Sequence, residues 1–272
     1  MSNDNKNRRN FIKKGAILGM TGMALPNNMF ANKTATTINT NTFDMNIRPK
    51  VLFFDVNETL LDLTTMRKSV GEALGGREDL LSLWFTTMLQ YSLVNTVARQ
   101  YDDFAVIGTA ALQMVAANHD ITLSEEKAKT AIVTPLRSIP AHPEVKDALK
   151  ALKADGYKLV SFTNSSNIGV KTQFENAGLI ELFDERLSIE DIGKYKPDAD
   201  AYQWAARKLE VQPNECFMIA AHGWDIAGAV WAGWRAAFIS RPGAQLYPLA
   251  PKPEMNESDL KKIAEKLISL KK

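Results

Sequence analysis

The apolar residues of this chain fall into short continuous runs that alternate with helical patterns. Val51–Phe54 is a run of four apolar residues that leads directly into Asp55. A strand that is buried on both faces of a sheet has this pattern. Similar runs are found at 158–162, 216–220 and 236–240, with helical segments between them. The alternation predicts an α/β fold with a parallel sheet and right-handed crossovers.

Residues 64–140 follow a different pattern. Their apolar residues recur every three or four positions without strand-like alternation, and this spacing predicts helices that each bury one face. The clearest series are Leu80, Leu81, Trp84 and Met88, followed by Phe104, Ile107, Ala111, Leu112 and Val115. We therefore expect a helical domain over 64–140, inserted into a core domain made of residues 49–63 and 141–272. A final amphipathic helix is predicted over 257–270.

Residues 1–31 have the pattern of an export signal. Arg8 and Arg9 precede a short, mildly apolar stretch, and paired arginines in this position are typical of the twin-arginine (Tat) route. The apolar stretch is too short to span a membrane comfortably. We expect cleavage near Ala31, a linker over 32–48, a periplasmic location and no membrane span after removal of the signal. A basic tail without a targeting role is the alternative.

Composition narrows the function further. The 272 residues are 24% charged and 45% apolar, as in ordinary globular proteins. The formal net charge of +2 does not suggest a surface that binds nucleic acid. Cys216 is the single cysteine of the sequence, so no disulfide can form within the chain. Its place in an apolar run favours a packed thiol over a nucleophile.

Polar residues follow three of the predicted strands. Asp55 comes after the first strand, Thr163 after the second and His222 after the third. The other polar residues of these segments are Asn57, Thr59, Asn164, Asp225 and, before a proline, Lys196. Ligands of open α/β sheets bind outside the carboxyl ends of the strands, and a carboxylate held there can act as a nucleophile. Each signal alone is weak, since Asp and Asn are common turn residues, but together they predict an active site at one edge of the sheet.

In these segments the sequence resembles the haloacid dehalogenase (HAD) superfamily, and it is most similar to its type II L-2-haloacid dehalogenases. Asp55–Leu60 resembles the nucleophile motif, Ser161–Ser165 the second motif, Lys196–Tyr202 the lysine motif and Ala221–Ala229 the acidic motif. The resemblance covers roughly residues 48–245. It implies a Rossmann-like, doubly wound parallel sheet with a helical cap inserted after the first motif, which agrees with the organisation predicted above.

Two positions separate phosphate chemistry from carbon chemistry in this superfamily. Phosphatase members carry a second Asp two residues after the nucleophile as general acid and base. This chain has Asn57 there, and an amide does not exchange a proton in this way at neutral pH. Phosphatases also usually carry an Asp that helps to hold Mg²⁺, where this chain has Ala221. We therefore expect no metal and no other cofactor, and a Mg²⁺-dependent phosphatase is disfavoured.

The resemblance implies a hydrolase that acts on the carbon–halide bond of short (S)-2-halocarboxylates. Asp55 attacks the halogen-bearing carbon and displaces halide, and water that Asp225 orients or activates hydrolyses the aspartyl ester. Lys196 keeps Asp55 ionised by lowering its pKa. Thr59, Thr163 and Asn164 hold carboxylates by hydrogen bonds. The other expected substrate-binding residues are Asn57, Phe85, Phe104, Tyr202, His222 and Trp224, with the cap and Trp224 excluding bulk water. Homodimers are typical of the resembling family.

The sequence departs from that family at several site positions. Phe85 stands where the family has the arginine thought to take the leaving halide, which removes a cation and several donors. His222 replaces the usual asparagine, and Asn57 replaces a common aromatic residue. Either a protonated His222 takes over part of leaving-group or carboxylate binding, or the substrate is not an ordinary 2-haloacid. A hydrolase of the same fold for another small acid or ester, and a non-catalytic binding protein, are the alternative functions.

Overall fold

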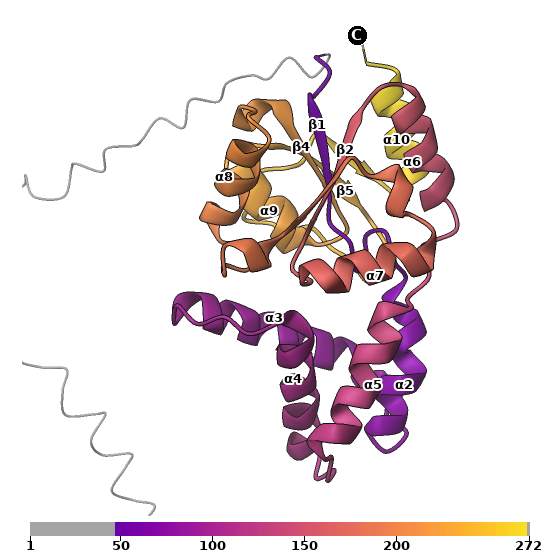
Figure 1. Ribbon diagram of the computed structural model, residues 1–272, viewed down its shortest axis with the longest axis vertical. Helices are drawn as coiled ribbons and strands as arrows, with labels where there is room; N and C mark the ends of the chain where they lie inside the picture. Colours follow the sequence, from indigo (N-terminus) through magenta and orange to yellow (C-terminus); the bar gives the residue numbers. More distant parts are fainter. Residues whose placement is uncertain (1–46, 271–272) are drawn as a thin grey trace, which may run out of the picture. The chain divides into compact units, whose positions relative to one another are not determined.

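A six-stranded parallel sheet forms the centre of the core domain in the computed structural model, which describes residues 47–270 (Figure 1). The strands run in the order β3-β2-β1-β4-β5-β6. They are β1 (Val51–Phe54), β2 (Lys158–Thr163), β3 (Glu185–Ser188), β4 (Cys216–Ala220), β5 (Arg235–Ile239) and β6 (Met255–Glu257). The parallel sheet and its central strands confirm the α/β fold expected from the sequence.

Strand β1 lies in the middle of the sheet and is paired on both sides. Phe53 is level with Val160 of β2 and with Met218 of β4. Its ring packs against Phe162 and Trp234, with ring centroids 6.3 and 4.5 Å away. Every residue of β1 is buried. The continuous apolar run follows from this position, because neither face of the strand meets water.

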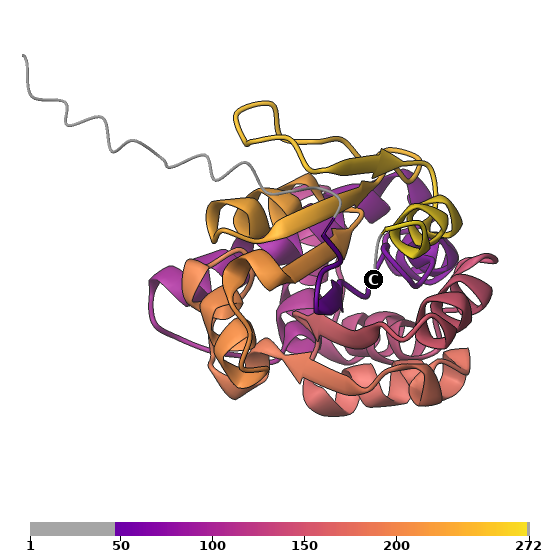
Figure 2. The ribbon, with the colours of Figure 1, turned by 90° about the horizontal axis from the view of Figure 1, so that it is seen from above.

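Helices cover both faces of the sheet, as expected for a doubly wound fold (Figures 1 and 2). One face carries α6 (Val145–Ala154), α7 (Asn167–Ala177) and α10 (Leu260–Ile268), and the other carries α8 (Ala199–Lys208) and α9 (Gly223–Trp231). Short 3-10 helices are found at Ile180–Leu182, Ile189–Asp191 and Pro213–Glu215. The chain moves outward from β1 to β2 and β3, and then outward again from β4 to β6. The point between β1 and β4 is therefore the topological switch point, where ligands of such sheets bind.

The cap consists of the helices between β1 and β2, which lie together below the sheet in Figure 1. They are α2 (Arg67–Ala73), α3 (Leu81–Val97), α4 (Phe104–Asn118) and α5 (Glu125–Arg137), with 3-10 helices at Leu63–Met66 and Glu78–Leu80. Trp84 Nε1 of α3 donates to the carbonyl of Gly108 in α4 at 2.8 Å. A Cβ at Gly108 would lie 2.8 Å from Met88 Sδ, so the glycine lets the two helices approach this closely without moving the Met88 side chain.

The two segments that join cap and core run side by side. The backbone N–H of Asp62 donates to the carbonyl of Pro140 at 2.8 Å, and that of His142 donates to the carbonyl of Leu60 at 3.0 Å. These bonds hold the start and the end of the insertion together at the end of the nucleophile motif. The cap is thereby anchored beside the loop that carries Asp55.

Two strands were not predicted from the sequence, and both lie at the edges of the sheet. β3 has one apolar residue, Leu187, in four, and β6 has three residues, of which Met255 is the apolar one. An edge strand is covered on fewer sides, so a continuous apolar run is not required of it. The helix predicted over 257–270 begins later, at Leu260, because Met255–Glu257 pairs with β5 and Asp259 caps the helix.

Some of the sequence predictions lie beyond this description. The signal segment 1–31 and most of the linker 32–48 fall outside residues 47–270. The boundaries of cap and core at 64 and 140 stay a prediction. Within residues 47–270, none of the helices has the length and apolar content that crossing a membrane requires.

Candidate active site

The carboxyl ends of β1, β2 and β4 bring most of the predicted site residues together. Asp55 directly follows β1, Thr163 ends β2 and His222 follows β4. Asp225 lies in the first turn of α9, and Lys196 comes from the loop before α8. β1 and β4 are adjacent in the sheet, so the nucleophile motif and the acidic motif meet at the switch point.

The ammonium of Lys196 lies between two carboxylates and is fully buried. Its Nζ is 3.1 Å from Asp55 Oδ1 and 2.6 Å from Asp225 Oδ2, and it donates to the carbonyl of Phe162 at 2.8 Å. Burial alone would lower the pKa of Lys196, but the charges of Asp225 and Asp55 outweigh this and raise it above 10.5. Lys196 is therefore protonated in the resting site, as a cation at its centre.

Asp55 is 5% exposed and accepts hydrogen bonds at both oxygens. Burial would raise its pKa, but the charge of Lys196 and the hydrogen bond from His222 lower it well below 3.8. Thr59 Oγ1 donates to Asp55 Oδ2 at 2.6 Å and accepts from the backbone N–H of Ala221 at 2.9 Å. The Thr59 hydroxyl is thus oriented by the backbone toward Asp55, which stays ionised across the neutral range.

Asp225 has an environment of the opposite kind. It is fully buried, and the hydroxyl of Tyr202 donates to its Oδ1 at 2.6 Å. Burial raises the pKa of Asp225, Lys196 opposes this, and the nearby charge of Asp55 raises it further, so that it lies above 3.8. A Cβ at Gly228 would lie 2.6 Å from the Tyr202 hydroxyl oxygen. The glycine on α9 therefore leaves the space that Tyr202 needs to reach Asp225.

His222 bridges two carboxylates. Its Nδ1 lies 3.0 Å from Asp55 Oδ2 and its Nε2 lies 2.7 Å from Glu58 Oε2. The ring is stacked between Phe85 of the cap and Trp224 of α9, with centroids 5.8 and 4.9 Å away. Burial would lower the pKa of His222, but the hydrogen bonds and charges of the two carboxylates raise it to about 10. Both ring nitrogens then carry protons and donate.

Glu58 is the contact that the sequence reasoning missed. Its carboxylate binds His222, and its backbone is in the left-handed region, with φ of 61°. Residues with a Cβ rarely adopt this conformation. Two features of the sequence could have indicated this contact. Glu58 lies in the nucleophile motif, one residue before Thr59, and the acidic motif carries a histidine in place of the usual asparagine.

The two predicted asparagines hold other parts of the protein. The Asn164 amide accepts from the backbone N–H of Lys196 at 3.0 Å and so fixes the lysine loop. The Asn57 amide donates to Ser165 Oγ at 3.1 Å and accepts from Gln173 Nε2 at 2.9 Å. Both side chains are already hydrogen-bonded within the protein. Direct binding of substrate by them stays a prediction.

Thr163 is buried, and its Oγ1 accepts from the backbone N–H of Ser165 at 3.1 Å. The hydroxyl proton is left for a second partner, since a hydroxyl both donates and accepts. The expected hydrogen bond from Thr163 to a carboxylate stays a prediction.

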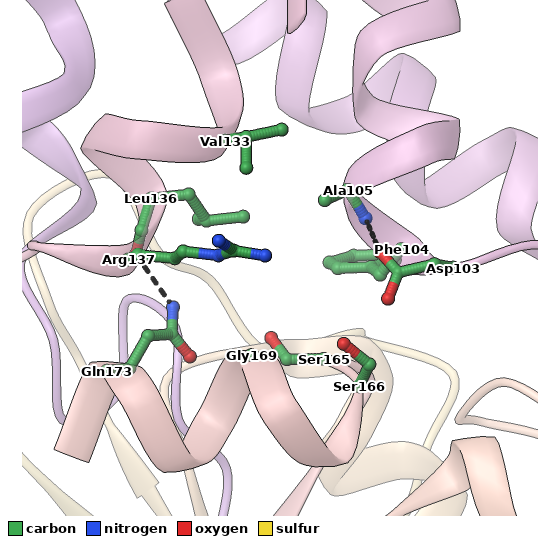
Figure 3. Close-up of a pocket in the computed structure, with 10 residues that line it drawn as sticks. All are labelled: Asp103, Phe104, Ala105, Val133, Leu136, Arg137, Ser165, Ser166, Gly169 and Gln173. Atoms are coloured by element: carbon green, nitrogen blue, oxygen red, sulfur yellow. Dashed lines mark hydrogen bonds between the residues drawn. The ribbon is translucent and has the colours of Figure 1, made fainter. Parts of the chain in front are cut away.

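The predicted aromatic residues line two different cavities at the boundary of cap and core. Phe85, Trp224 and His222 line the larger one, of about 390 Å³. Phe104 lines a cavity of about 40 Å³ together with Ser165 and residues of α5 and α7 (Figure 3). Phe104 also packs against Tyr195, beside the lysine motif. The structure therefore separates Phe104 from the cluster around His222.

Comparison with known proteins identifies the family. The family model for a haloacid dehalogenase-like hydrolase matches residues 49–233, more than half of the chain. The chain belongs to this family. This chain is similar to (S)-2-haloacid dehalogenase 1 of Pseudomonas sp. (strain CBS-3), with 32% identity over 73% of this chain and 88% of that protein. It is also 29% identical to (S)-2-haloacid dehalogenase 4A of Burkholderia cepacia, over 70% of this chain and 82% of that protein.

The fold agrees with solved structures of the family. A crystal structure of a dehalogenase with an intermediate complex matches with a TM-score of 0.75 and 26% identity, over 83% of this chain and 99% of that chain. L-2-haloacid dehalogenase from Xanthobacter autotrophicus has the same fold, with a TM-score of 0.76 and 21% identity over 82% of this chain and 100% of that one. The resemblance inferred from the four motifs is confirmed.

The side chains at the switch point do not resemble a metal site. A metal site is lined by ligand atoms, whereas here the Lys196 ammonium contacts the two carboxylates. Among residues 47–270, no group of three or more His, Cys, Asp or Glu side chains is arranged to hold a metal ion. Ala221, at the position where the sequence analysis looked for an acid, is buried. The Lys196 ammonium lies between the two remaining acids.

The raised pKa of His222 predicts a specific dependence of stability on pH. A histidine with a folded pKa of about 10 and an ordinary value of 6.5 stabilises the folded state fully below pH ~6.5, and this contribution is lost as the pH rises through ~10. His222→Asn removes it. At about 1.4 kcal/mol per pKa unit, the free energy of unfolding lost in this variant should shrink by a few kcal/mol over that range.

Urea unfolding of both proteins across the same pH range measures this difference. A difference that does not change with pH would show that His222 is neutral in the folded state.

Proposed function

We propose that this protein is a metal-independent dehalogenase that hydrolyses short (S)-2-halocarboxylates through an aspartyl ester on Asp55. The observation that carries the proposal is the ion cluster of Asp55, Lys196 and Asp225 at the switch point. One carboxylate is held ionised and the other has its pKa raised, which is how paired carboxylates divide the roles of nucleophile and base. The names of the relatives support the substrate class.

Carbon chemistry is favoured over phosphate chemistry by the contacts of Asn57. In a phosphatase, the side chain at this position must reach the leaving group and exchange a proton with it. Here the amide is buried and bonded to Ser165 and Gln173, so it neither titrates nor points freely into the site. Together with Ala221, this leaves the protein without the general acid and with fewer oxygen ligands than Mg²⁺ prefers.

In the first half of the reaction, Asp55 Oδ1 attacks the halogen-bearing carbon and halide leaves with the bonding electrons. Oδ1 accepts a hydrogen bond from Lys196, whereas Oδ2 accepts from both Thr59 and His222. A carboxylate oxygen has two acceptor sites, so Oδ1 keeps one free for the carbon. In the second half, water attacks the ester carbonyl carbon and passes a proton to Asp225.

The leaving halide would not meet an arginine at position 85, because this position is Phe85. Both nitrogens of His222 are engaged with Asp55 and Glu58, which argues against direct capture of halide or carboxylate by this ring. Phe85 and Trp224 offer ring edges, which carry partial positive charge and attract an anion weakly. Asp55 is 5% exposed, so a substrate reaches it only when the cap moves or a neighbouring side chain rotates.

The first prediction from this mechanism is halide release that depends on Asp55 and not on metal. Wild-type protein should release chloride from 2-chloropropionate and bromide from 2-bromopropionate at the same rate with and without EDTA. Asp55→Asn should lower this activity by at least about a thousandfold, since removing a covalent nucleophile abolishes the route. An ion-selective electrode measures the release.

The controls separate the alternative functions. If no short haloacid yields halide, the dehalogenase proposal is wrong. Hydrolysis of p-nitrophenyl phosphate that EDTA abolishes favours the phosphatase instead. Activity on small carboxylic esters without halide release favours a hydrolase of another acid or ester, and binding of small acids without turnover favours a non-catalytic protein.

Phe85→Arg tests whether a missing cation limits halide departure. An added guanidinium gives the leaving halide a charge and several donors, so chloride release should rise by up to about tenfold, the equivalent of one ion contact of about 1.4 kcal/mol. The step is measured in a single turnover with enzyme in excess. Phe85→Leu removes the ring without adding charge and is the matched control; equal rates in both variants contradict the idea.

We also propose export by the twin-arginine route, on the basis of Arg8 and Arg9 and the apolar stretch after them. A full-length fusion to a reporter should reach the periplasm of a bacterial host that has the route, and Arg8→Lys with Arg9→Lys should keep it in the cytoplasm. Periplasmic delivery of the double variant, or cytoplasmic retention of the parent, would contradict the proposal. The expected homodimer stays a prediction.

A further inference from the structure

We propose that His222 and Thr59 form an oxyanion hole for hydrolysis of the Asp55 ester, and that Glu58 is the positioning residue that holds His222 in this role. The inference rests on the proposed function and assigns residues to its second half-reaction. It concerns a histidine where the resembling family has an asparagine, and a glutamate with no role in the motifs described above.

The geometry at Asp55 Oδ2 carries the inference. The hydroxyl of Thr59 and the Nδ1 of His222 both lie within hydrogen-bond distance of this oxygen, at 2.6 and 3.0 Å. Once Oδ1 is bonded to the substrate carbon, Oδ2 is the carbonyl oxygen of the ester. The two donors are then aimed at the atom on which negative charge develops when water adds, which is the arrangement that stabilises acyl-transfer transition states.

Water adds to Cγ of the ester, one of its protons passes to Asp225, and the carbonyl electrons move onto Oδ2. When the electrons return, the Cγ–Oδ1 bond breaks, and Oδ1 leaves as the hydroxyl oxygen of a 2-hydroxy acid after taking a proton from Lys196. Asp55 regains two oxygens, one of them from water, and its new acid proton restores Lys196. The proton on Asp225 goes to solvent.

The backbone of Glu58 gives an independent reason to assign it a function. The other residues with a Cβ and a positive φ within 47–270 are Arg99, Asp120 and Glu210, and each lies just after the end of a helix, where a left-handed residue completes the last turn. Glu58 lies after a strand and follows no helix. Its unfavourable conformation instead directs its carboxylate to His222 Nε2 at 2.7 Å, and strain of this kind is typical of functional sites.

The surroundings of His222 explain why a carboxylate is needed there. Lys196 also contacts Asp55, and Arg67 and Arg241 line the same cavity as His222. These cations disfavour a charged imidazole, whereas Asp55 and Glu58 favour it; Asp225 is bound to Lys196. When Asp55 becomes a neutral ester, Glu58 is the carboxylate that still contacts the ring. The structure thus provides a charge that keeps His222 protonated during ester hydrolysis.

Variants at His222 test the oxyanion hole. The probe is 2-chloropropionate, with halide followed by rapid quench and the protein by intact-mass spectrometry. His222→Ala should lower kcat by about 10²- to 10³-fold, the effect of losing one oxyanion donor. It should still release about one halide per active site in a burst and accumulate the ester on Asp55. His222→Asn keeps a neutral donor and should lie between Ala and wild type.

Glu58→Gln tests the positioning role. It keeps the size and the backbone conformation but removes the charge, so kcat should fall by roughly 10- to 100-fold, the worth of a charged hydrogen bond. The alkaline limb of the kcat profile should move to lower pH, which a purely structural role would not produce. Glu210→Gln is the matched control, because Glu210 is an exposed glutamate with φ of 54°; its activity and pH profile should not change.

The possible outcomes are distinct. A burst with trapped ester in the His222 and Glu58 variants supports the inference. Loss of the burst, with the first turnover slowed as much as kcat, overturns it, because His222 would then act in the alkylation step. If wild-type protein releases no halide at all, the proposed function fails and the inference fails with it. Thermal unfolding of each variant identifies any loss of activity that is due to misfolding.

Discussion

The buried ammonium of Lys196 is the interaction on which the site depends. A charge without solvent is stable only when opposite charges and hydrogen bonds surround it, and Lys196 has both, from Asp55, Asp225 and the carbonyl of Phe162. One carboxylate directly follows β1 and the other lies in α9, and the lysine loop is held to the end of β2 by Asn164. One cation therefore couples three elements, and removing it would leave two acids buried beside each other.

The same cation lies between two chemically identical side chains whose pKa values are shifted in opposite directions. Asp55 also accepts from Thr59 and His222, and its pKa is lowered, whereas the more deeply buried Asp225 has its pKa raised. An acid with a low pKa stays ionised and is available as a nucleophile. An acid with a raised pKa is the better proton acceptor. Burial and the number of donors, and not residue type, separate the pKa values of the two acids.

The sequence predicts those parts of the fold and site that short segments determine. A run such as Val51–Phe54 specifies a buried strand, and the residue that follows it must lie at the end of the sheet. Edge strands such as β3 escape, because their partial exposure removes the apolar pattern. The role of Glu58 depends on a left-handed backbone and on a histidine far along the chain, and the separation of Phe104 from Phe85 depends on how the cap packs. Neither is visible in local spacing.

Asn57 shows how one position joins chemistry to domain packing. Gln173 of α7 donates both to Asn57 and to the carbonyl of Leu136 in the cap, at 2.9 and 3.0 Å, and this second bond is visible in Figure 3. The side-chain amide of Gln173 therefore links the core helix α7 to both the loop that carries Asp55 and the cap. An aspartate at position 57 would still accept from Gln173 but would not donate to Ser165, and its buried charge would require a cation of its own. The amide thus satisfies Ser165 without adding a buried charge, and its oxygen links the loop that carries Asp55 to the cap through Gln173.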